Sequence, residues 1–545
     1  MQFLFSMTGG AFVILVSSAA AQPPGDRPRI VDKITIERQQ VFEESDTTFL
    51  HAMVGKYANS IHILTDEDVI RRELLFKEGE PYNQQLVDES ARHLRKLGIL
   101  GGIRFTTDTL SDSTVSVTVQ ARDRWSLRPS MSVREGGGVS GFGIGIREDN
   151  FLGTAQKWNV GYDRLSDRRN PNGGEFGFEE PRTFGSWWTT SLQYRNADEL
   201  RLASVDAERP FFADTATWAA RGFAGVTRTR IRLYDDGLVT SESYLNQENE
   251  IGWVASSSGT DTKLQLAAAY VRTRSTADSM QARAFDNVDL VIGQLSILRR
   301  EYVKGNFIEN FGRVEDVPLG YQAGIAIGRN LYLTHRGGVD YFVRVFGQSS
   351  FAVQDQLFAS YQASVSTYVV GREANEMTVM ATALHAWRVT PHQTLISRMT
   401  TTIGSQWAPT SQLTLGSFSG LRGYRNFQFS GQRLMLVNLE DRAFSGLSVW
   451  FLRLGGTFFF DSGMVWHEGE GPFGHRFHSD AGLGIRVESG KNLGSGIFRF
   501  DIAYNFERRS IGIVLSTDHL FRGFSEMDFQ PPIPGASTSG PTRGD

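Results

Sequence analysis

One arginine and two acidic residues near the C-terminal end of the chain form its strongest candidate for a functional cluster. Arg422 stands in a stretch, residues 407–431, that we predict to be a long loop. Glu440 and Asp461 lie in the two alternating segments that follow, and the alternation places both acids on the polar faces of neighbouring strands. Buried carboxylates are costly unless they are paired. A guanidinium on an inward-folded loop would supply paired hydrogen bonds, with Gly423 letting the backbone turn sharply. We therefore predict a buried ion-pair cluster around Arg422.

Other site chemistry finds little support. The chain contains no cysteine, which excludes a disulfide scaffold, a thiolate metal site and a cysteine nucleophile. Three histidines and three acids crowd residues 467–480, but their spacing fits no metal motif, and we interpret them as part of a solvated loop. No nucleophile–base arrangement stands out. The net charge of −4 does not indicate a nucleic-acid partner. We predict no enzyme activity, no metal and no cofactor.

The elements that would position the cluster belong to a predicted membrane all-β fold, a transmembrane β-barrel over residues 123–524. Short segments there alternate apolar and polar residues and are separated by Asp, Asn, Gly and Ser; examples are Lys263–Val271, Tyr341–Phe346 and Ile497–Tyr504. Aromatic residues make up 12% of the chain and glycine is frequent, at 57 residues. We favour sixteen strands and expect no more than twenty. Alternation alone leaves a soluble β-sandwich or a propeller array open.

The ends of the chain carry different signals. Residues 1–21 combine an apolar run with small residues before Gln22, which predicts a signal peptide, and residues 22–28 read as a linker. Residues 525–545 hold four of the sixteen prolines and are predicted to be disordered.

Residues 29–122 predict a small α/β domain in the order β-α-α-β-β. The first helix would start with Thr65 as its N-cap, and the second with Asn83. The last strand, Thr114–Gln120, alternates strictly. Because no catalytic cluster occurs here, we interpret the domain as a binding module whose strand edge could accept an extended peptide.

Two regions resemble a known family. The α/β order, with Gly79 between the helices and Gly98 after the second, resembles a POTRA (polypeptide-transport-associated) domain. Leu421-Arg422-Gly423-Tyr424 is similar to the (V/L/I)RG(F/Y) motif in the sixth extracellular loop of the BamA/TamA outer-membrane assembly family. The run from Phe459 through Asp461 to Gly463 is similar to that family's F/Y-x-D-x-G strand.

The resemblance implies a role for the cluster and a function. Arg422 would fold into the lumen and pair with Asp461 and Glu440. The protein would lie in the bacterial outer membrane with its N-terminal domain in the periplasm. It would insert or translocate unfolded client polypeptides, outer-membrane proteins above all, in contact with outer-membrane lipid and with periplasmic assembly partners. The strands at about Leu127–Glu135 and Ser510–Ser516 would form a lateral gate. A two-partner-type secretion pore, a lipid transporter and a passive porin remain alternatives.

Overall fold

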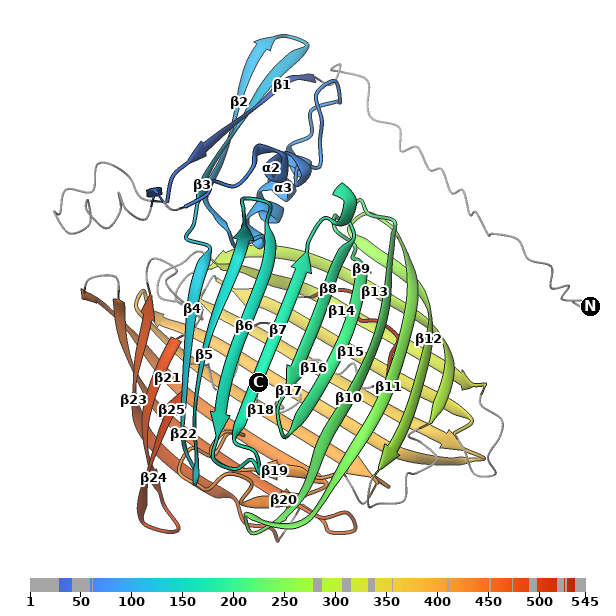
Figure 1. Cartoon of the computed structure of the whole chain (residues 1–545), viewed down its shortest axis with the longest axis vertical. Coiled ribbons are helices and arrows are strands. Elements are labelled where there is room, and N and C mark those ends of the chain that lie inside the picture. The colour runs from blue at the N-terminus through green and yellow to red at the C-terminus, as the bar shows by residue number, and fades with distance from the viewer. Residues whose placement is uncertain are drawn as a thin grey trace, which may run out of the picture.

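The computed structural model shows a small α/β domain on one end of a closed β-barrel (Figure 1). The predicted signal peptide and linker, residues 1–28, lie outside the described residues. The structure describes residues 29–41, 59–60, 62–277, 287–305, 315–331, 339–354, 356–408, 411–449, 452–472, 474–489, 497–516, 524 and 527–534.

The N-terminal domain is a three-stranded sheet with two helices packed on it. Its strands β1 (Ile30–Gln39), β2 (Leu100–Ser111) and β3 (Thr114–Asp123) are ordered β1-β3-β2, so β3 is central, parallel to β1 and antiparallel to β2. The helices α2 (Glu67–Arg72) and α3 (Gln84–Lys96) follow β1 in the chain. In the part of the chain that is described, no helix has the length and apolar character needed to cross a membrane.

Local sequence explains most of this domain. The strict alternation of β3 buries its valines, including Val117, against the helices. The Asn83 side chain accepts a hydrogen bond from the Gln85 backbone N–H at 2.9 Å, as expected of an N-cap. The predicted cap of the first helix is wrong. Asp66 is the N-cap residue, and its side chain forms no capping hydrogen bond. The Thr65 hydroxyl donates instead to the Asp123 carboxylate at 3.0 Å, so it does not cap the helix.

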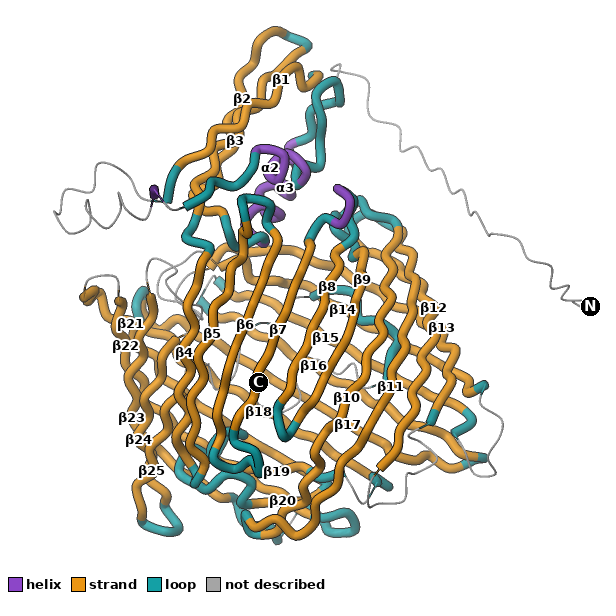
Figure 2. Tube along the Cα trace, in the orientation of Figure 1, coloured by secondary structure: helices purple, strands orange, loops and turns teal. Residues whose placement is uncertain are grey.

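Twenty antiparallel strands close into the barrel, at the upper end of the predicted range (Figure 2). The order follows the chain throughout and closes between β25 and β4. The strands are β4 (Leu127–Gly136), β5 (Val139–Phe151), β6 (Gln156–Leu165), β7 (Asn172–Glu180), β8 (Thr189–Asn196), β9 (Leu200–Arg209), β10 (Trp218–Asp235), β11 (Leu238–Ser258), β12 (Thr262–Ala277), β13 (Val288–Gly305), β14 (Glu315–Asn330), β15 (Tyr341–Val353), β16 (Leu357–Val370), β17 (Glu373–Thr390), β18 (Gln393–Ser405), β21 (Arg433–Val449), β22 (Leu452–Trp466), β23 (His478–Ser489), β24 (Ile497–Asn505) and β25 (Ser510–Ser516). A two-stranded hairpin, β19 (Leu413–Leu415) and β20 (Phe429–Gly431), lies in the loop between β18 and β21, and a short 3-10 turn, Thr183–Gly185, lies between β7 and β8.

The two faces of the barrel wall differ as the alternation predicts. On β13, Val291 and Leu295 are exposed on the outer face, whereas Gln294 and Ser296 are buried toward the lumen. An apolar exterior closed by a continuous hydrogen-bond ladder is the form in which strands cross a bilayer, because no backbone group is left unpaired in lipid.

In the part of the chain that the structure describes, the seam between the first and last barrel strands is the least paired junction. β25 and β4 share a single register pair, Leu515 with Glu135, whereas β24 and β25 pair along the whole of β25. Glu135 lies near the far end of β4, away from the N-terminal domain. Residues 517–523, which follow β25, lie outside the described residues.

The N-terminal domain docks on the nearby barrel turns through polar contacts. Asn150 donates to the Thr65 hydroxyl at 2.9 Å, and the Asp66 backbone N–H donates to the Gly153 carbonyl at 2.9 Å. Glu73 of the domain is almost fully buried and forms an ion pair with Arg182 of the β7–β8 turn. These contacts hold the domain over β5–β8 at the end of the barrel where β4 begins, hereafter the POTRA end (Figure 1).

His93 makes this docking sensitive to pH. Burial lowers the pKa of His93 to about 4, and the positive charge of Arg182 acts in the same direction. The imidazole packs edge-on against Trp187 of the barrel, and its Nδ1 lies 3.8 Å from Glu73. A pKa below the ordinary value means that the docked state binds a proton less readily than a solvated histidine does. Docking is thus favoured above about pH 6.5 and weakens as the pH falls toward 4.

We expect the docked state to lose about 2 kcal/mol of stability between pH 7 and pH 5 through His93. Hydrogen exchange of α3 in the reconstituted protein measures this loss. The H93Q variant serves as the control, since it cannot titrate. Burial also raises the pKa of Glu73, despite the lowering effect of Arg182. Glu73 therefore favours docking as the pH falls, opposite to His93, and it does so equally in wild type and H93Q. Equal pH dependence in wild type and H93Q would contradict the assignment.

The C-terminal segment departs from its prediction. Residues 525–545 were expected to be disordered, but residues 527–534 have a defined path inside the barrel lumen, where Met527 is fully buried. The reason is that Phe529 and Ile533 pack on an apolar part of the inner wall.

Candidate functional site

Arg422 lies inside the barrel and joins acids from three strands. Its guanidinium binds Asp461 of β22 with two parallel hydrogen bonds, Nε to Oδ2 at 2.7 Å and Nη2 to Oδ1 at 2.8 Å. Nη1 donates to Glu440 of β21 at 2.8 Å and lies 3.4 Å from Asp501 of β24. The side chains of all four residues are fully buried or nearly so. The paired geometry matches the planar guanidinium to a carboxylate, the strongest form of ion pair available to a protein.

Neighbouring groups fix the orientation of this ion pair. The Phe459 ring lies under the guanidinium, with the Arg422 Cζ 3.5 Å from the ring centroid, which adds a cation–π contact. Asn438 donates both to Asp461 at 2.7 Å and to the Gly420 carbonyl at 2.9 Å. The alternation of β21 and β22 produces this arrangement, because register pairs Asn438 with Asp461 and directs both inward.

Sequence reasoning missed the part of the cluster that β23 and β24 supply. Arg486 pairs with Asp501, and Arg499 lies 3.4 Å from the same carboxylate. Arg442 of β21 donates to Glu440 at 2.8 Å. These three arginines of the inner wall balance the negative charge of the acids. Asp480 completes the acidic set as the register partner of Asp461. The signal was available, since Arg499 and Asp501 alternate on one face, but no motif drew attention to it.

Each residue of the loop motif has a separate place. Leu421 is fully buried in an apolar cluster with Leu415, Leu434 and Leu436. The Tyr424 hydroxyl donates to the Ser479 carbonyl at 3.2 Å.

Gly423 is needed for a different reason than predicted. Its backbone is not in the left-handed region, which Gly420 occupies instead with φ +128°. A Cβ on Gly423 would lie 2.8 Å from the Asp480 Cβ, so the close approach of loop and wall is what requires glycine. Gly463 serves the same purpose on β22, because a Cβ there would lie 2.9 Å from Leu415 of β19.

The loop also touches both sides of the seam. Asn426 donates its side-chain amide to the Gly136 carbonyl at 2.9 Å and its backbone N–H to the Gly137 carbonyl at 3.0 Å, at the far end of β4. On the other side, the Arg422 carbonyl lies against Gly512 of β25, where a Cβ would approach it to 3.3 Å. The ion-pair cluster therefore anchors a loop that spans the far end of the seam.

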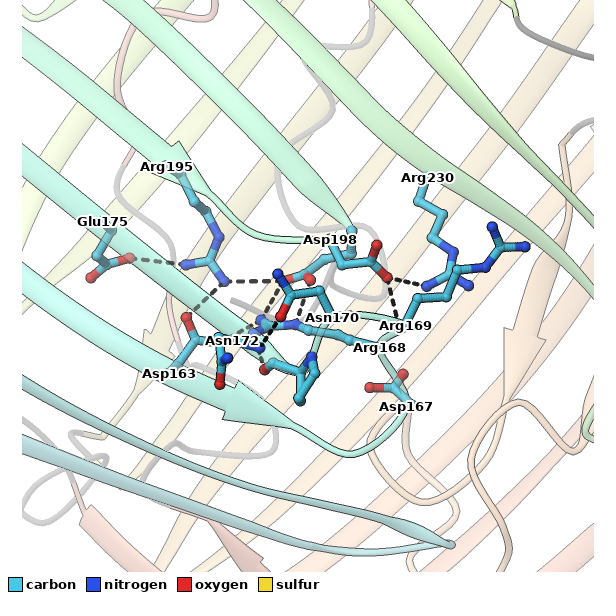
Figure 3. Close-up of polar contacts among 12 residues, drawn as sticks. Asp163, Asp167, Arg168, Arg169, Asn170, Asn172, Glu175, Arg195, Asp198 and Arg230 are labelled. Carbon is cyan, nitrogen blue, oxygen red and sulfur yellow. Dashed lines mark hydrogen bonds and ion pairs between the residues drawn. The ribbon is translucent and has the colours of Figure 1, made fainter.

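A second charged cluster, also missed from the sequence, ties together the far ends of β6 to β10 (Figure 3). Arg168 of the β6–β7 turn is buried and pairs with Asp163 and Glu199. Arg195 pairs with Glu175 at 2.9 Å, and Arg230 with Asp198. These contacts join strands and turns of the barrel wall, and we infer that they stabilise this rim of the barrel.

Comparison with known proteins supports the assignment of the N-terminal domain. Residues 62–122 match the POTRA family, described as "Surface antigen variable number repeat". No curated protein sequence matches the chain.

Similar solved structures include BamA from Haemophilus ducreyi lacking POTRA domains 1–3, with a TM-score of 0.41 and 12% identity over 89% of this chain and 84% of that one. They also include CdiB from Escherichia coli, with a TM-score of 0.44 and 11% identity over 92% of each chain. CdiB from Acinetobacter baumannii has a TM-score of 0.41 and 11% identity over 90% of this chain and 74% of that one.

The fold and the match define the class of protein. It is a POTRA domain followed by a closed twenty-stranded β-barrel, the architecture that the sequence predicted from its resemblance to the BamA/TamA family.

Proposed function

We propose that this protein inserts or translocates other polypeptides at the bacterial outer membrane, with its POTRA domain in the periplasm. The seam carries the proposal. A strand edge that opens readily is a template for pairing with another chain, and among the described residues β25 and β4 share one register pair, Leu515 with Glu135.

The proposed mechanism is mechanical and includes no enzymatic step, metal or cofactor. The seam opens, and an extended client segment pairs with the exposed edge of β4 and is released into outer-membrane lipid. The loop bonds from Asn426 hold the far end of β4 in place during this exchange, and the Arg422 cluster holds the loop. A seam with few ladder hydrogen bonds opens at little cost, and among the described residues one register pair, Leu515 with Glu135, joins the two strands. Periplasmic assembly partners would deliver clients to the POTRA domain.

The alternatives differ in what they require of the lumen. A passive porin needs an open channel, whereas this lumen holds the Arg422 loop and residues 527–534. A two-partner-type secretion pore would pass its client through the lumen rather than along the seam, and a lipid transporter would need no strand pairing at all.

Depletion of the protein followed by outer-membrane proteomics tests the proposal. Broad loss of β-barrel proteins supports insertion, and loss of one exported protein supports dedicated secretion. An unchanged outer-membrane and secreted proteome, with altered lipid composition or small-solute uptake alone, would overturn it.

A further inference from the structure

The inner wall of the barrel carries an apolar patch, which is unusual because barrel lumens are mostly polar. Buried side chains of β11, β13 and β15 that face the lumen form it, including Trp253, Leu290, Ile292 and Phe342. A second, smaller apolar group around Phe358 lies at the POTRA end. Exposed to water in an empty lumen, such surfaces would be costly, so they indicate a site for an apolar ligand.

The C-terminal segment of the chain covers both groups. Phe524 packs edge-on against Phe358, with ring centroids 6.2 Å apart. Phe529 packs against Trp253 at 5.2 Å and against Phe211 at 5.6 Å, and Ile533 lies on the same patch.

Polar side chains of the wall bind both backbone carbonyls and side chains of this segment. Gln294 donates to the Gln530 carbonyl at 2.7 Å, and Arg344 reaches the Pro531 carbonyl at 3.4 Å and the Gln530 side chain at 2.7 Å. No carboxylate among the described residues pairs with Arg344, although it is almost fully buried. A buried cation of this kind needs carbonyl partners, and here they come from the segment. Contacts to carbonyls tolerate many sequences.

The segment is built to occupy this groove without becoming a strand. Pro531, Pro532 and Pro534 lack a backbone N–H, so this stretch of the segment cannot donate to a β ladder. Beyond Pro534 the lumen continues as a cavity of about 340 Å³ that Trp407 and Glu376 help to line.

The anchor at the POTRA end is shared with the docked domain. Arg300 donates to Asp528 of the segment at 2.7 Å and to Asp214 of the β9–β10 turn at 3.0 Å. The Asp214 backbone N–H in turn donates to Glu89 of α3 at 2.6 Å. Movement of the POTRA domain would therefore disturb Asp214, which is bonded to Arg300, the residue that holds the segment.

We propose that the lumenal groove on β11–β15 binds extended, aromatic-containing polypeptide, and that Phe524 and residues 527–534 are a plug in cis that fills it until a client displaces them. The identity of the client rests on the proposed function. Occupancy of the groove by the segment does not rest on the proposed function, and its test uses no client.

Deletion of residues 525–545 leaves all twenty strands and Phe524 in place and removes the rest of the plug. We expect single-channel conductance in planar bilayers to rise several-fold. Deletion of residues 535–545 alone, which keeps Phe524–Pro534, is the matched control and should leave the conductance unchanged. A labelled peptide of residues 524–534 should bind the longer deletion, lower its conductance again, and fail to bind the full chain.

Point variants keep the proposal testable if the deletion fails to fold. In the full chain, F529A should raise the open probability. A peptide carrying F529A should bind the truncated barrel about ten-fold more weakly than the unaltered peptide, because it loses the ring contacts with Trp253 and Phe211. Unchanged conductance on deletion, or a peptide that neither binds nor blocks, would overturn the plug. Either result leaves insertion of clients at the seam untouched, and failure of insertion would likewise leave the plug intact.

Discussion

Replacement of Arg422 by alanine should destabilise the barrel by about 3–5 kcal/mol, because it leaves buried carboxylates without their central cation. Asp461 would lose both of its arginine hydrogen bonds, and Glu440 and Asp501 would keep only their wall arginines. The loop would also lose its anchor at the far end of the seam. Heat-dependent mobility on a denaturing gel and urea unfolding in detergent both measure the effect.

Two further variants serve as controls. One keeps the charge of Arg422 but changes its geometry, and the other removes an arginine outside the cluster. R422K keeps the charge but cannot form the paired bonds to Asp461, and we expect an intermediate loss of stability. R476A removes a largely exposed arginine that lies 3.1 Å from Glu507, and it should change stability by less than about 1 kcal/mol. An R422A barrel as resistant to heat and urea as wild type would refute the role of the cluster.

Locking the seam should abolish client insertion. The register pair Glu135 and Leu515 allows the double variant E135C/L515C, and because the chain has no native cysteine its disulfide would be unique. We expect the oxidised protein to insert clients at least about ten-fold more slowly into liposomes than the reduced protein, since the single bridging pair could no longer part. Reduction should restore the rate.

A disulfide away from the seam provides the control. Ile502 and Ile513 are register partners on β24 and β25, both on the outer face, so I502C/I513C closes a junction that the proposed gate never opens. It should leave insertion unchanged when oxidised. Equal insertion rates for the locked and unlocked seam would rule out lateral opening.

Local sequence was enough to predict the two building blocks and the centre of the site. Period-two alternation is a property of each strand alone, and it placed Glu440 and Asp461 inward before any strand partner was known. The capping chemistry of Asn83 and the valine face of β3 are equally local. An arginine in a long loop beside two inward acids then indicated the pairing that the structure contains.

Only the tertiary structure decided what depends on register and closure. Asp501 reaches Arg422 because the shear of the closed barrel brings β24 beside the loop, and no spacing along the chain encodes that distance. The single register pair that the described residues of β25 and β4 share arises in the same way. Residues 527–534 looked disordered because their prolines exclude regular structure, yet an apolar wall assembled from distant strands gives Phe529 and Ile533 a place to bury. Side-chain direction is fixed locally, whereas the partners that it meets are fixed by how the strands close.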